Sequence, residues 1–388
     1  MAMVGRFPPK RPTSLLLPMF FGGLALLASC GGSADQGEPP TFSPLVRALK
    51  RLPLDFKDKG VWFGDLDRAL VIAGLPGPLG QEELQALERS EREAYLWATD
   101  GVVLDITIAA RPDEQWEDTF GFNASDISLS VRTGEFFTDP HGVALLEGTL
   151  DSDIVRRRLQ DLGYKEESAA GRTYYAIRGD YEMDHDDPGS RLAINQMNRV
   201  FVEDGMLIRA GATDEMVGIL EAWDGRTPAL ARDPAFASLA AALGDPLSAV
   251  LLTSQAVLET ERLQPPREYR KQRGWGVLHE WNALGVGYEV TDDGGRSFIF
   301  SLFYTDPDAA ASDGDELVRR MEGYETAPPV RDSPTHPIAE SCGSLSWSHA
   351  EAEGGSTLTV RCTLKADTSG SLWYGLVEVR DLGFLLPN

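Results

Sequence analysis

The sequence has few of the residues from which catalytic and metal sites are usually built. It contains three cysteines and five histidines, and no two histidines stand at the spacing of metal ligands. It also lacks a G-x-S-x-G elbow, an S-x-x-K motif and a P-loop. Sequence therefore gives an enzyme little support, although active sites also assemble from distant residues.

Positive charge is scarce as well. The chain has 36 lysines and arginines against 60 aspartates and glutamates, a formal net charge of −24. Such a surface repels phosphate groups, which argues against nucleic acid and anionic headgroups as main partners. No apolar stretch after residue 28 approaches the ~18 residues of a membrane-spanning helix. A hydrophobic content of 42% is nevertheless typical of a folded globule.

The longest apolar run lies near the N-terminus. Residues 1–13 carry three basic residues and no acidic one, and residues 14–28 read SLLLPMFFGGLALLA. This run has the length of a signal-peptide core and is short for a membrane span. We therefore predict an export signal over residues 1–29.

The tetrapeptide Leu27-Ala28-Ser29-Cys30 resembles the lipobox of bacterial lipoproteins. The resemblance implies that Cys30 receives a diacylglyceryl group, becomes the new N-terminus after cleavage and is often acylated further, for example with palmitate. Such chains would anchor the protein firmly in a membrane, since each buried CH₂ contributes about 0.8 kcal/mol. The alternative is an ordinary signal peptide with a chance cysteine. The lipobox predicts an extracytoplasmic location, at the cell surface or in the periplasm, with residues 30–42 as a tether.

The other two cysteines, Cys342 and Cys362, flank a polar, glycine-rich turn centred near Ala352. Strand-like runs at 344–348 and 357–364 predict a hairpin that places the two thiols opposite each other, within disulfide reach. An oxidising compartment favours this bond over two free buried thiols. A loop of this length should gain about 3 kcal/mol from the bond.

Hairpins followed by helices recur along the chain. The four predicted units are 127–163, the hairpin 198–211 with a helix from Thr213, the hairpin 285–304 with a helix from about Asp308, and the cysteine hairpin with a helix at 371–385. This order predicts an α+β fold, with antiparallel sheets and helices on one face, and it is compatible with two similar halves.

A seam between the halves is predicted at 222–246. There Asp233 is suited to cap a helix that begins at Pro234 and ends at Gly244. We therefore expect a first domain over 43–225 and a second, disulfide-bonded domain over 226–388. Within the first, the segments EGTLDSDIVRRRLQDLGY and GRTYYAI are similar to uncharacterised exported bacterial proteins, a resemblance that implies no activity.

An acidic loop at 179–189 is a candidate calcium site. Its carboxylates include Asp180, Asp184, Asp186 and Asp187, and Ca²⁺ takes six to eight oxygen ligands. The loop lacks the central glycine and the distal glutamate of an EF-hand. A solvated acidic turn, with no cofactor bound, is therefore the favoured interpretation.

One basic island interrupts the acidic sequence. Arg267, Arg270, Lys271 and Arg273 suit a segment that docks on anionic lipid or envelope polymer. The favoured alternative is a segment neutralised by the protein's own acidic surface.

Aromatic residues also gather at 113–123. Trp116, Phe120 and Phe122 suit a sugar-binding platform, but buried core anchors are the favoured interpretation.

Together these patterns predict a lipid-anchored cell-envelope protein that acts as a non-catalytic binding or scaffold module with an envelope protein as its partner. The first alternative is a carrier that holds an apolar ligand against the strands at 142–148, 247–253 and 298–304. The second is an envelope hydrolase.

Overall fold

The computed structural model describes residues 43–102, 113–134, 142–258, 274–291, 293–324, 338–370, 372–378 and 382–387. Residues 42–388 form one compact unit. The predicted signal, the lipobox with Cys30 and the basic residues Arg267, Arg270, Lys271 and Arg273 lie outside the described residues. The interpretations placed on them stay predictions.

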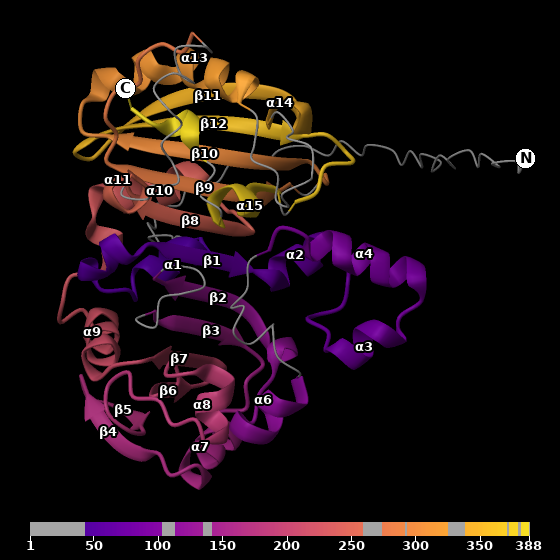
Figure 1. Ribbon diagram of the computed structural model, residues 1–388, viewed down its shortest axis with the longest axis vertical. Coiled ribbons are helices and arrows are strands. Elements are labelled where there is room, and N and C mark those ends of the chain that lie inside the picture. The colour runs from indigo at the N-terminus through magenta and orange to yellow at the C-terminus, as the bar shows by residue number, and fades with distance from the viewer. Residues whose placement is uncertain are drawn as a thin grey trace, which may run out of the picture. The chain divides into compact units, whose positions relative to one another are not determined.

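The strands of the described residues form one antiparallel sheet of twelve, shown face-on in Figure 1. Their spatial order is β11-β12-β10-β9-β8-β1-β2-β3-β7-β6-β5-β4. Their bounds are β1 Val61–Asp65, β2 Ile127–Thr133, β3 Ala144–Gly148, β4 Lys165–Ala169, β5 Arg172–Ala176, β6 Arg199–Glu203, β7 Met206–Ala210, β8 Ser248–Thr253, β9 Ala283–Val290, β10 Arg296–Tyr304, β11 Cys342–Ala352 and β12 Gly355–Leu364.

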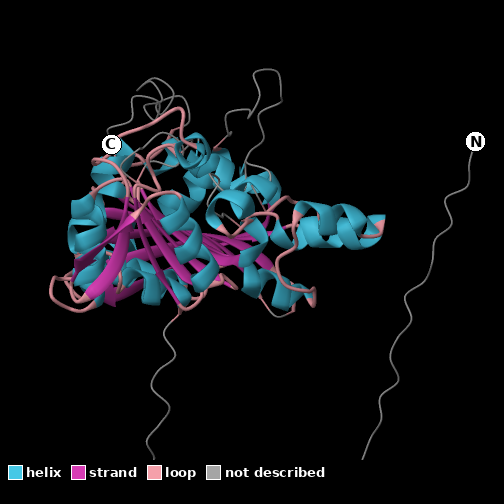
Figure 2. Ribbon diagram, turned by 90° about the horizontal axis from the view of Figure 1, so that it is seen from below, coloured by secondary structure: helices cyan, strands magenta, loops and turns pink. Residues whose placement is uncertain are grey.

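Helices pack along this sheet, which Figure 2 shows turned by 90°. Their bounds are α1 Pro44–Leu49, α2 Leu66–Ala73, α3 Gln81–Ala86, α4 Arg89–Thr99, α6 Asp113–Phe120, α7 Ser152–Asp161, α8 Pro188–Ala193, α9 Thr213–Trp223, α10 Pro234–Leu243, α11 Ser254–Leu258, α13 Pro307–Gly323, α14 Ile338–Ser341 and α15 Leu372–Glu378. Within the described ranges, none of these helices combines the length and the apolar character needed to cross a bilayer.

All four predicted units of a hairpin followed by a helix are present: β2-β3-α7, β6-β7-α9, β9-β10-α13 and β11-β12-α15, although α15 covers only part of the helix predicted at 371–385. The local signals are those that the sequence carries. Asp151 caps α7 by accepting bonds from Asp153 N and Ile154 N, both 3.0 Å, and Gly205 turns the β6–β7 hairpin at a φ of 72°. The predicted α+β class is confirmed.

The two halves of the chain share one strand layout. The order β1-β2-β3-β7-β6 in the first half matches β8-β9-β10-β12-β11 in the second, and β4 and β5 extend the first half. The halves join where β1 pairs antiparallel with β8, with Phe63 opposite Ala249. An antiparallel junction between equivalent strands relates the two layouts by an approximate twofold axis.

Helices cover both faces of the sheet, whereas we expected one. Phe63 and Ile208 lie in a core with residues of α1, α9 and α10, and this core continues through both halves. Trp62 and Phe300 point to the opposite face, where they pack with α13 and α15. The central strands are apolar on both sides, so each face requires a cover.

The second face carries two separate cores. One lies over the second half and includes Trp62, and the other lies over the first half and includes Ala144. Arg132 pairs in register with both of these residues and is only 4% exposed. The buried Arg132 of β2 therefore lies between the two cores, with Trp62 on one side and Ala144 on the other.

The predicted disulfide between Cys342 and Cys362 is present, with a Cα–Cα distance of 5.3 Å. The two cysteines are not directly opposite. Cys362 pairs in register with Leu345, and a bulge between Cys342 and Ser344 brings the thiols together. The offset arises because the hairpin turns at Glu353-Gly354, after the predicted centre at Ala352. A disulfide is typical of extracytoplasmic proteins.

Candidate binding groove at the sheet edge

Helix α10 forms one wall of a groove at the β11 edge of the sheet. Asp233 Oδ1 caps this helix by accepting bonds from Ala235 N at 2.9 Å and Phe236 N at 3.2 Å. The helix lies close to β9 because Gly285 and Gly287 present no side chain there. A Cβ at Gly287 would lie 3.1 Å from Leu243. The apolar side of α10 thus packs against β9 and β10, and another side of the helix faces the edge strands β11 and β12.

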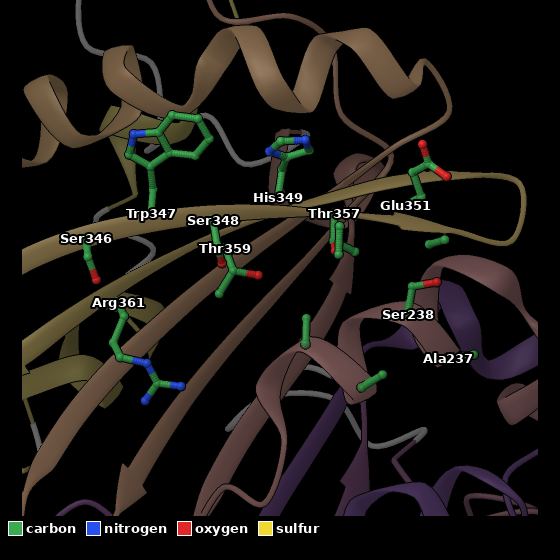
Figure 3. A pocket seen from close by; sticks show the side chains of 14 residues that line it. Ala237, Ser238, Ser346, Trp347, Ser348, His349, Glu351, Thr357, Thr359 and Arg361 are labelled. Carbon is green, nitrogen blue, oxygen red and sulfur yellow. The ribbon is translucent and has the colours of Figure 1, made fainter.

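The groove lies between that flank and the β11–β12 hairpin and has a volume of about 570 Å³. Figure 3 shows it from close by. Of the fourteen residues that line it, ten have small side chains, and the other four are Trp347, His349, Glu351 and Arg361. The small ones are Ala237, Ser238, Ala241 and Ala242 of α10, Ser346, Ser348, Ala350 and Ala352 of β11, and Thr357 and Thr359 of β12.

The groove forms because the side chains on this face of the sheet become smaller or more polar toward its β11 edge. In one register row, Ile299 of β10 is followed by Arg361 of β12 and Ser346 of β11. In the next row on this face, Ser301 is followed by Thr359 and Ser348. Hydroxyl side chains with little apolar surface cannot hold a further helix. Arg361, the long side chain in these two rows, is ion-paired with Glu289.

The other face of β11 is held by α13. In Figure 3 the side chains of Trp347 and His349 point away from the labelled α10 residues. Trp347 Nε1 donates to Asp315 Oδ1 at 2.8 Å, and the ring of His349 lies 6.2 Å from that of Trp347. The strand is therefore positioned from one side and open on the other.

The outer edge of β11 is open too. It stands at the end of the sheet, with no described strand beyond it, and most of its eleven residues are exposed. Residues 342–350 contain no lysine, arginine, aspartate, glutamate or proline. The opposite edge, β4, carries Lys165, Glu166 and Glu167. Charges of this kind discourage added strands, so one edge of the sheet is guarded and the other is not.

The four candidate calcium ligands do not converge on one point. Asp180 Oδ1 accepts bonds from Thr213 N at 2.9 Å and from Arg199 Nη2 at 2.7 Å. Asp187 caps α8 through Ser190 N at 2.7 Å and pairs with Arg178 at 3.0 Å.

Asp184 accepts a bond from Asp186 N at 3.0 Å, so the loop uses its carboxylates to fold itself. Across the described ranges, no group of three or more His, Cys, Asp or Glu side chains is placed to hold a metal ion.

The aromatic residues at 113–123 are core anchors, as the favoured interpretation predicted. Trp116, Phe120 and Phe122 are fully buried. Their ring centroids lie between 5.2 and 6.3 Å apart. No sugar platform is formed by these rings, because none of them reaches the surface.

One histidine has a carboxylate partner that sequence reasoning did not identify. His279 Nδ1 lies 2.6 Å from Asp313 Oδ1, and Asp313 Oδ2 also accepts from Tyr304 Oη at 3.1 Å. Ser312 Oγ approaches the same Nδ1 at 3.3 Å. A catalytic triad needs its serine and its carboxylate on different ring nitrogens. This cluster instead joins the segment before β9 to α13.

The strands that we expected to line an apolar cavity are buried among other core residues. These strands all contribute to packed clusters with their covering helices, through Val143, Leu145 and Leu146 in the first half and through Val250 and Phe300 in the second.

Comparison with protein families, with curated proteins and with solved structures finds no match for this chain. Among the described residues, the groove and the open β11 edge are the features that best indicate a function.

Proposed function

We propose that this protein is a lipid-anchored module of the cell envelope that binds another protein along β11. The observation that carries this proposal is the open edge of β11 beside the groove. An edge strand with free backbone donors and acceptors is a template for protein contact. The lipobox sequence at Cys30 supports membrane anchoring, and the Cys342–Cys362 bond supports an oxidising compartment.

The first experiment tests the anchor. Full-length protein is expressed in bacteria that are fed an alkyne-bearing palmitate, with a Cys30→Ser variant as the comparison. We expect acyl labelling and recovery in the membrane fraction for the wild type, and loss of labelling in the variant. Labelling that survives the Cys30→Ser substitution would contradict the lipobox assignment.

The second experiment tests the binding surface in intact cells. A photo-crosslinking amino acid replaces His349, which is exposed on β11, and in a matched strain it replaces Ser168, which is exposed on β4. We expect a discrete protein adduct from position 349 alone, and its loss when Ser348→Lys is added. The absence of a protein adduct at 349, together with an apolar molecule extracted from the purified protein, would favour the carrier alternative.

A further inference from the structure

We infer that the partner contributes an extended, cationic segment that joins the sheet as a thirteenth strand outside β11. This inference rests on the proposed function and adds the binding mode and the chemistry of the partner. Three observations carry it: the unguarded edge, the difference between the two sides of β11, and the charge around them.

The backbone of β11 determines the binding mode. In an edge strand, alternate residues direct their N–H and C=O groups away from the neighbouring strand. β12 occupies one side of β11 over nearly its whole length, from Cys342 to Ala352. The outward groups of the uncharged stretch 342–350 are thus arranged for an added strand, which would lie about 4.8 Å away.

The two sides of β11 determine the side-chain pattern of that strand. Successive side chains of a strand point to opposite faces. On the α10 side, an added strand meets the groove with Ser346, Ser348 and Ala350 at its rim. Small or β-branched side chains suit that space.

On the α13 side, the added strand meets Trp347 and the exposed carboxylate of Asp315, which are 2.8 Å apart at Nε1 and Oδ1. An aromatic ring beside a carboxylate is a favourable place for a lysine or arginine. A segment that alternates small and cationic residues therefore matches both sides.

Charge decides between a cationic partner and a second copy of this chain. Glu351 and Glu353 at the hairpin end are exposed and form no ion pair with another described residue. The whole chain carries a formal charge of −24, so two copies repel each other whereas a cationic segment is attracted. A cationic segment therefore fits this edge better than a second copy of the chain does.

The test is fluorescence anisotropy with full-length protein in detergent and a labelled peptide, Ser-Arg-Val-Lys-Ser-Arg-Val-Lys-Ser. One control peptide has the same composition with its four cations placed consecutively, and another has glutamate in place of each cation. We expect saturable binding of the alternating peptide, binding about tenfold weaker for the consecutive one, and no binding of the acidic one.

Two variants address the edge and the groove separately. Ser348→Lys guards the edge, and Ala241→Trp fills the groove from an exposed position on α10. Each should weaken the alternating peptide about tenfold. Ser168→Lys on β4 adds the same charge at the opposite edge and should leave binding unchanged.

The inference would be overturned if the two cationic peptides bound equally well, or if the Ser348→Lys variant bound the alternating peptide as tightly as the wild type does. In either case the contact would be a generic attraction to an acidic surface. A dimer that Ser348→Lys dissolves would also overturn it in favour of a second copy. If the cellular adduct at position 349 forms while the alternating peptide does not bind, the partner chemistry is wrong and the proposed function stands. If neither occurs, both fail.

Discussion

Gly314 of α13 lies directly against the indole of Trp347 on β11. A Cβ added to Gly314 would come within 2.3 Å of Trp347 Cδ2, closer than real side chains approach. The same indole donates to Asp315, the next residue of the helix. One residue without a side chain and one carboxylate therefore fix the edge strand to α13, which leaves the opposite side of β11 free to form the groove.

This contact predicts a reversal of the usual effect of alanine in a helix. Gly→Ala inside a helix ordinarily stabilises by ~0.5–1 kcal/mol, but overpacking costs ~1–3 kcal/mol. Gly314→Ala should therefore lower the free energy of unfolding, which urea titration measures. Gly323→Ala, in the same helix and with nothing within 4 Å of its Cβ, is the control and should be neutral or stabilising. A more stable Gly314→Ala protein would contradict the contact.

The disulfide gives a second prediction. The bond spans 20 residues, so replacing both Cys342 and Cys362 by alanine should lower the free energy of unfolding by about 3 kcal/mol. Dithiothreitol should lower the stability of the wild type by a similar amount and leave the double variant unaffected. Equal urea midpoints for oxidised and reduced wild type would show that the bond does not stabilise the fold.

A third prediction concerns acid. Burial alone would raise the pKa of Glu316, but its bonds from Arg319, Arg320 and Gly276 N hold the pKa below its usual 4.5. Arg320 is fully buried, and its Nε lies 2.9 Å from Glu316 Oε1. Because the folded pKa is depressed, this stabilisation is present above pH 4.5 and is lost as the pH falls through the folded value.

Glu316→Gln should therefore destabilise the protein by about 2 kcal/mol at pH 7 and should flatten the fall in stability below pH 4.5. Glu322→Gln, an exposed position on the same helix, is the matched control and should do neither. Urea unfolding at several pH values distinguishes the two variants. If the free energy of unfolding of Glu316→Gln fell below pH 4.5 as steeply as that of the wild type, another carboxylate would control this acid dependence.

Much of the fold follows from short-range signals in the sequence. The turns at Asp204-Gly205 and Asp293-Gly294 and the cap at Asp233 each act within a few residues, and the structure uses them all. The β4–β5 hairpin was missed because β4 reads Lys-Glu-Glu-Ser-Ala, an exposed edge without an apolar face. The apolar periodicity of residues 81–97 favours one helix, but the structure divides this stretch into α3 and α4 at Leu87-Glu88.

The groove could not be predicted in the same way. Its walls come from α10 and from β11 and β12, about a hundred residues apart in the chain, and only the sheet order brings them together. The signal was present in part, since 342–350 is an uncharged strand among acidic surroundings. Recognising it as an open edge requires knowing which strands have neighbours, and that depends on long-range pairing.

The most direct test of the central claim is hydrogen exchange of the β11 amides, with and without the alternating cationic peptide. An added strand bonds to alternate outward amides, so exchange at residues 344–350 should slow while exchange in β4 stays the same. Slowed exchange at β11 that disappears in Ser348→Lys is the predicted result. Bound peptide with no change in β11 exchange would contradict strand addition at this edge.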